Sequence, residues 1–173
     1  MKFIKLVLLA AVILAIAGIF MPKSYVIKRE IPIAAQADAI QGYIENMDSW
    51  ERWVTWEEAQ PPAGNRPAQM ESGVGSGKYF SANSGSAWFV IKSSSAIDGF
   101  EYTIHYDTGD KATGLIRLIE LGPQTKVEWT VKGSVEGPPV LAPYIVKSKE
   151  FLLGSELNQN LKNLKKIIEQ EEG

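Results

Sequence analysis

The chain has 173 residues, a net charge of −2 and no cysteine, which excludes disulfide bonds, thiolate nucleophiles and cysteine-based zinc sites. Its single histidine, His105, excludes a multi-histidine metal site, and its scattered lysines and arginines form no basic stripe for nucleic acid. We therefore expect no metal, no cofactor and no nucleic-acid partner.

The first 22 residues are typical of a membrane anchor. Lys2 and Lys5 precede an uninterrupted apolar run over residues 6–21. With its flanking residues, the run is about as long as a minimal membrane span. Two alternatives stay open, because Ala15-Ile16-Ala17 has the small-x-small form of a signal-peptide cleavage site and because a fully buried helix is also apolar on every face.

Flanking charges indicate the orientation of this anchor. Lys2 and Lys5 favour a cytoplasmic N-terminus, although Lys23, Lys28 and Arg29 lie on the other side of the run. We expect a single-pass protein of the inner (cell) membrane. Residues 23–173 then form one globular domain on the periplasmic or equivalent extracytoplasmic side.

The start of this domain predicts a strand followed by two short helices. Ser24 to Ile33 is rich in β-branched residues and favours a strand. Helix formers over Ala34 to Ile44 predict a helix, and Met47 to Trp53 predicts a second helical turn. Tryptophan recurs at every third position, close to one helical face, in Trp50, Trp53 and Trp56.

Beyond a predicted loop over residues 57–70, short strands alternate with turn clusters. Connections this short require antiparallel neighbours. The expected strands are Gly77–Ser81, Ala87–Lys92, Gly99–Tyr106, Ala112–Leu121 and Thr125–Val135. A long amphipathic helix over about Ile145 to Gln170 follows, and its single apolar stripe comprises Leu153, Leu157, Leu161, Leu164 and Ile168.

Turn geometry predicts which side chains share a face of the sheet. A two-residue turn at Gly122-Pro123 pairs Leu121 with Gln124 and places Ile116 and Leu118 beside Val127, Trp129 and Val131. Pairing Tyr106 with Ala112 adds Phe100, Tyr102 and Ile104 to this face. If the inward–outward alternation of side chains continues across the loop to the preceding strand, Trp88 and Val90 also belong to it. His105 falls on the opposite, convex face. This aromatic sheet face under a leucine-striped helix either packs solid or leaves a pocket.

The order of these elements resembles the helix-grip fold of the SRPBCC superfamily, which includes START-like, polyketide cyclase/dehydrase and lipid-transport proteins. It is most similar to a bacterial branch with an N-terminal membrane helix. The matching stretches are residues 22–26 leading into 31–34, the tryptophans at 50, 53 and 56, Gly73-Val74-Gly75-Ser76, Thr125-Lys126-Val127-Glu128-Trp129 and Leu161-Lys162-Asn163-Leu164-Lys165. Ser148-Lys149-Glu150-Phe151 departs from the usual pattern.

The resemblance implies an α+β fold in which a curved antiparallel sheet wraps around the C-terminal helix, with a cavity for hydrophobic or aromatic molecules between them. It carries over no catalytic residue. The residues expected to line the cavity are Trp53, Trp88, Tyr102, Ile104, Ile116, Leu118, Trp129, Leu153, Leu157 and Leu161.

Three functions follow from these observations. The first is a membrane-tethered module that binds a hydrophobic small molecule or lipid in this cavity. The second is a cyclase- or hydrolase-like enzyme that uses the same cavity, for which Tyr102 and His105 are the available polar groups. The third is a membrane-linked interaction protein whose exposed tryptophans dock a partner.

Overall fold

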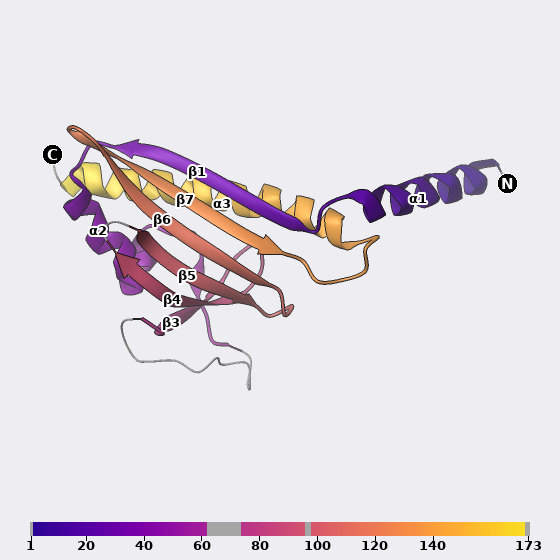
Figure 1. Cartoon of the computed structure of the whole chain (residues 1–173), viewed down its shortest axis with the longest axis horizontal. Coiled ribbons are helices and arrows are strands. Elements are labelled where there is room, and N and C mark those ends of the chain that lie inside the picture. Colours follow the sequence, from indigo (N-terminus) through magenta and orange to yellow (C-terminus); the bar gives the residue numbers. More distant parts are fainter. Residues whose placement is uncertain (1, 62–73, 96–97, 172–173) are drawn as a thin grey trace.

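The computed structural model describes residues 2–61, 74–95 and 98–171, and it confirms the helix-grip architecture (Figure 1). One seven-stranded antiparallel sheet, in the order β1-β7-β6-β5-β4-β3-β2, curves around a long C-terminal helix. The elements are α1 (Lys2–Phe20), β1 (Ser24–Ile33), α2 (Ala37–Glu45), the 3-10 helix η1 (Met47–Arg52), β2 (Glu57–Glu58), β3 (Gly77–Ser81), β4 (Ala87–Ser95), β5 (Gly99–Tyr106), β6 (Lys111–Leu121), β7 (Gln124–Ser134) and α3 (Ala142–Glu171).

Helix α3 packs its apolar stripe on the concave face of the sheet. The five predicted stripe residues are all buried, from Leu153 to Ile168. The helix begins at Ala142, three residues before the predicted start, with Pro143 in its first turn, where a missing backbone N–H costs nothing. Apolar periodicity therefore predicted this helix and its buried face correctly.

The β6–β7 hairpin has the predicted register. Leu121 pairs with Gln124 across the two-residue turn, and Ile116 lies opposite Trp129. The β5–β6 pairing differs from the prediction by two residues, because Ala112 lies opposite Ile104 and not Tyr106. A shift of two residues keeps every side chain on its face, so the faces of β5 and β6 are as predicted.

The predicted inward face of β4 is wrong. Trp88 lies opposite His105 on the convex face, whereas Phe89 lies opposite Ile104 and points inward. The cause is a one-residue irregularity in the β4–β5 pairing between Ile91 and Ser93. A bulge of this kind adds one residue to one strand and exchanges the two faces beyond it. Trp88 is consequently buried outside the main core cluster.

Helix α1 projects from the end of the domain at which α3 begins (Figure 1). The Tyr144 hydroxyl of α3 donates to the Leu14 carbonyl of α1 at 2.6 Å, and Gly18 of α1 packs on the backbone of Val140, just before α3. A Cβ atom at Gly18 would lie 2.7 Å from the Val140 carbonyl oxygen, so only glycine permits this approach. The opposite end of the domain carries α2 and the C-terminal turns of α3 (Figure 1).

The predicted loop over residues 57–70 begins with a short strand. Glu57 and Glu58 form β2 and pair with Ser81 and Phe80 at the edge of the sheet. Residues 59–61 follow β2 without helix or strand, as predicted, and residues 62–70 of the predicted loop lie outside the described residues, as does Gly73 of the glycine-rich stretch.

Candidate functional site

Three tryptophans occupy the space between the sheet and α3. Trp50 lies in η1, and Trp53 and Trp56 follow it directly. The ring centroid of Trp50 lies 5.4 Å from that of Tyr102 and 5.9 Å from that of Trp129. All five rings belong to one buried aromatic cluster at edge-on and tilted angles, which aromatic quadrupoles favour.

This cluster closes the cavity that the sequence led us to expect at the sheet–helix interface. Tyr102, Trp129 and Leu157 are 0 % exposed, so no water-sized space borders them. The other residues expected there are almost equally inaccessible, namely Trp53, Ile104, Leu153 and Leu161. The prediction of open space at this position is wrong, because the indoles of residues 50–56 fill it. Exposed tryptophans for docking a partner are excluded for the same reason.

The Tyr102 hydroxyl has a hydrogen-bond partner inside this core. It accepts a hydrogen bond from Trp129 Nε1 at 2.8 Å. Burial raises the pKa of Tyr102 well above its usual value, so the phenol stays protonated. Its ring lies over Gly114, the residue opposite in the β5–β6 register, where any Cβ atom would overlap the ring.

A polar stripe on α3 holds the tryptophan segment in place. Glu156, Asn160 and Asn163 stand beside the leucine stripe at spacings of four and three, and each meets residues 53–56. The pairs are Glu156 Oε2 with Trp56 Nε1 at 3.1 Å, Asn160 Oδ1 with the Thr55 amide at 2.8 Å, and Asn163 Nδ2 with the Trp53 carbonyl at 3.0 Å. These three residues were not predicted from the sequence, although their helical spacing next to the apolar face was a usable signal.

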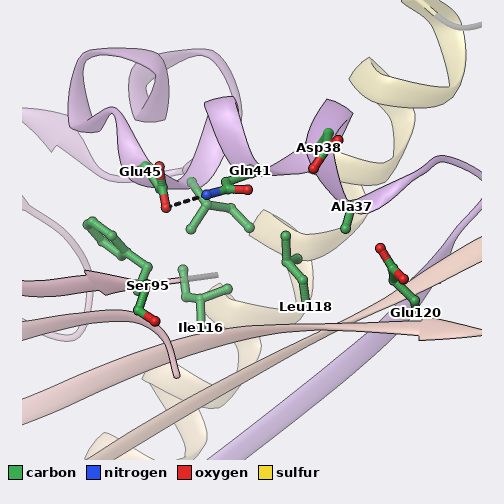
Figure 2. Close-up of a pocket in the computed structure, with 11 residues that line it drawn as sticks. Ala37, Asp38, Gln41, Glu45, Ser95, Ile116, Leu118 and Glu120 are labelled. Carbon is green, nitrogen blue, oxygen red and sulfur yellow. Dashed lines mark hydrogen bonds between the residues drawn. The ribbon is translucent and has the colours of Figure 1, made fainter. Parts of the chain in front are cut away.

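The candidate site is a pocket between α2 and the sheet, at the end of the domain remote from α1 (Figures 1 and 2). It encloses about 380 Å³, within the range of small-molecule sites. Its lining residues are Ala37, Asp38, Gln41, Ile44 and Glu45 from α2, Ser95 at the end of β4, Gly99 and Phe100 at the start of β5, and Ile116, Leu118 and Glu120 from β6. Of the residues predicted to contact ligand, only Ile116 and Leu118 line this pocket.

The pocket has an apolar floor and acidic ends. Figure 2 shows Ile116 and Leu118 in the middle, with Glu45 at one end and Asp38 above Glu120 at the other. Glu45 is already hydrogen bonded, because it accepts from Gln41 Nε2 at 2.7 Å and from the Ser94 hydroxyl at 2.5 Å. The described lining residues include no lysine, arginine or histidine.

A second polar cluster lies near the start of α3. The Lys149 ammonium lies 3.3 Å from Asp110 Oδ2 and 3.5 Å from the centroid of the Tyr106 ring. Burial lowers the pKa of Lys149. Burial disfavours the charge of Asp110, but hydrogen bonds from the Glu136 amide and the Thr108 hydroxyl, with the Lys149 charge, outweigh it and lower the pKa of Asp110. This buried pair connects α3 to the sheet and does not line the pocket.

His105 lies on the convex face opposite Trp88, as its alternation predicted. Burial and the neighbouring Lys111 charge lower its pKa. Asp107, two residues further along the chain, accepts a hydrogen bond from the Tyr79 hydroxyl at 2.5 Å. Across residues 2–61, 74–95 and 98–171, no three histidine, aspartate or glutamate side chains are grouped to hold a metal ion.

The fold is shared with solved structures that have little sequence similarity. Norcoclaurine synthase from Thalictrum flavum is 15% identical with a TM-score of 0.62, over 87% of this chain and 97% of that one. A Mesorhizobium loti protein is 13% identical with a TM-score of 0.61, over 84% and 98%. Ara h 8.0201 is 12% identical with a TM-score of 0.57, over 85% and 99%. Identities this low establish the helix-grip fold alone. No family model and no curated protein matches the sequence.

Proposed function

We propose that this chain is a membrane-tethered binding module that holds a hydrophobic or aromatic small molecule in the pocket between α2 and the sheet. The observation that carries the proposal is the apolar floor of this pocket, formed by Ile44, Phe100, Ile116 and Leu118 beneath an open mouth. Among the helix-grip structures that resemble it, norcoclaurine synthase was determined in complex with a transition-state analogue, which supports ligand binding by this fold.

The pocket favours a small molecule over a lipid from the anchoring membrane. Its volume of about 380 Å³ lies at the lower end of the range for small-molecule sites. It also lies at the end of the domain opposite α1 (Figure 1), so a ligand enters it from the aqueous side.

Helix α1 supports the membrane tether. It has 19 residues with a mean hydropathy of 2.8, and only 6% of its apolar window is buried. At a rise of about 1.5 Å per residue it reaches about 28 Å, close to the thickness of a bilayer core. Its contacts with Tyr144 and Val140 lie within its last two turns, so a tether through α1 would hold the start of α3 close to the membrane.

Binding is tested with the full chain in lipid nanodiscs and 3-phenylpropanol as an uncharged probe. Methyl NMR shifts of Ile44, Ile116 and Leu118 are expected to move on titration. Gln41→Trp, which fills the pocket, should abolish the shifts, whereas Gly42→Trp on the exposed side of α2 should preserve them. Shifts that are absent, or equal in both variants, would count against the proposal.

The tether and its orientation need a separate measurement. Intact mass of the membrane fraction should show the complete N-terminus, whereas cleavage after Ala17 would identify a signal peptide. Because the chain has no cysteine, Leu121→Cys provides a single label in an exposed hairpin. A membrane-impermeant maleimide should label it in intact spheroplasts if the domain is extracytoplasmic.

A further inference from the structure

We propose that the pocket selects organic cations, namely ammonium groups carried on an apolar or aromatic body. This inference rests on the proposed binding function and specifies the chemistry of its ligand. The observation behind it is the juxtaposition of an apolar floor with unneutralised carboxylates from two different elements at one end of the pocket.

The β6 wall passes from apolar to acidic along its inward face. Ile116, Leu118 and Glu120 alternate by two residues and therefore point to the same side of the sheet. Ile116 is buried and Leu118 half-buried, whereas Glu120 at the end of the strand is exposed. A ligand body that lies over Ile116 and Leu118 would bring its head group to the Glu120 carboxylate (Figure 2).

The α2 wall supplies a second carboxylate to the same end. Asp38, Gln41 and Glu45 recur at spacings of three and four residues, so they share one helical face above the floor. Figure 2 shows Asp38 above Glu120 across the pocket. Among the described residues, neither of these two carboxylates forms an ion pair or side-chain hydrogen bond, in contrast to Glu45.

The nearest basic residues of the sheet are directed elsewhere. Lys126 lies opposite Ile119 and so belongs to the convex face, where its ammonium is 3.7 Å from Glu30. Arg117, one residue from the floor, also points to that face and donates to the Asp98 carbonyl at 3.4 Å. The Asp38–Glu120 end therefore has a negative potential without an internal counter-ion.

This potential discriminates between ligands of equal size and different charge. A cation about 4 Å from a carboxylate near a protein surface is attracted and an anion is repelled. With two carboxylates partly screened by solvent, we expect an ammonium ligand to bind about tenfold more tightly than its neutral alcohol. The difference should shrink as salt is added, because exposed charges are screened.

Three probes of one shape test the inference: 3-phenylpropylammonium, 3-phenylpropanol and 3-phenylpropionate. Each is titrated into the full chain in nanodiscs of zwitterionic lipid, with empty nanodiscs as the partition control, and binding is followed by the same pocket methyl shifts. The ammonium is expected to bind most tightly and the carboxylate least tightly. The double variant Asp38→Asn, Glu120→Gln should remove the preference and retain alcohol binding.

A matched control removes two exposed carboxylates outside the pocket, in Glu57→Gln, Glu136→Gln, and should retain the preference. Equal binding of ammonium and alcohol, tighter binding of the carboxylate, or a preference that survives the Asp38 and Glu120 substitutions would overturn the inference while leaving the proposed function intact. If none of the three probes binds, the proposed function itself is refuted together with the inference.

Discussion

Truncation of Trp50 is expected to be among the most destabilising single changes in this protein. Its side chain is 0 % exposed and contacts the rings of Trp53 and Trp56, which follow η1, and rings from four strands. Removing an indole leaves a void on the order of 140 Å³, which at about 24 cal/mol per Å³ costs about 3 kcal/mol. The variant also loses the hydrogen bond from Trp50 Nε1 to the Ile44 carbonyl at 2.9 Å, which adds about 1 kcal/mol.

The same void should bind free indole. Apolar cavities of this size stay dry and accept small aromatic molecules. At an indole concentration ten times its dissociation constant, Trp50→Ala should regain about 1.4 kcal/mol. The assay is urea unfolding of the full chain in nanodiscs, followed by near-ultraviolet circular dichroism with and without indole.

Trp88→Ala is the matched control, because Trp88 is also buried but lies on the convex face beside Tyr79. We expect it to cost about 1–2 kcal/mol and to gain nothing from indole. A loss below about 1 kcal/mol for Trp50→Ala, or equal indole rescue of both variants, would refute the packing argument.

Further expected outcomes concern stability. Gly114→Ala should destabilise the protein by about 2 kcal/mol or more in urea unfolding, because its Cβ atom displaces the Tyr102 ring, whereas Gly42→Ala in α2 has free space and should stabilise by up to about 1 kcal/mol. Asp110→Asn leaves the Lys149 ammonium buried without its counter-ion and should cost about 3 kcal/mol, part of which Lys149→Met in the same chain should restore. The folded pKa of Asp110 is lowered, so its contribution is present above the unfolded pKa of about 4 and is lost as pH falls through the folded value. Thermal unfolding from pH 6 to pH 2 should therefore show a smaller pH-dependent loss in Asp110→Asn than in the parent, and an equal loss would contradict the assignment.

Features encoded by local periodicity could be predicted from the sequence. The apolar run that forms α1, the leucine stripe of α3 and the β6–β7 register at Gly122-Pro123 each depend on residues close together in the chain. Helix and strand periods fix which side chains share a face, so these segments carry their own structural information. Even the two-residue error in the β5–β6 pairing left its faces correct.

Two features were decided only by tertiary structure. The irregularity between Ile91 and Ser93 exchanges Trp88 for Phe89 on the inward face, and no turn signal in the sequence marks a bulge inside a strand. The position of the pocket depends on how completely side chains from residues 50–56 fill the concave face of a sheet formed much later in the chain. Periodicity determines the direction of a side chain, whereas free volume depends on all the distant segments that pack together.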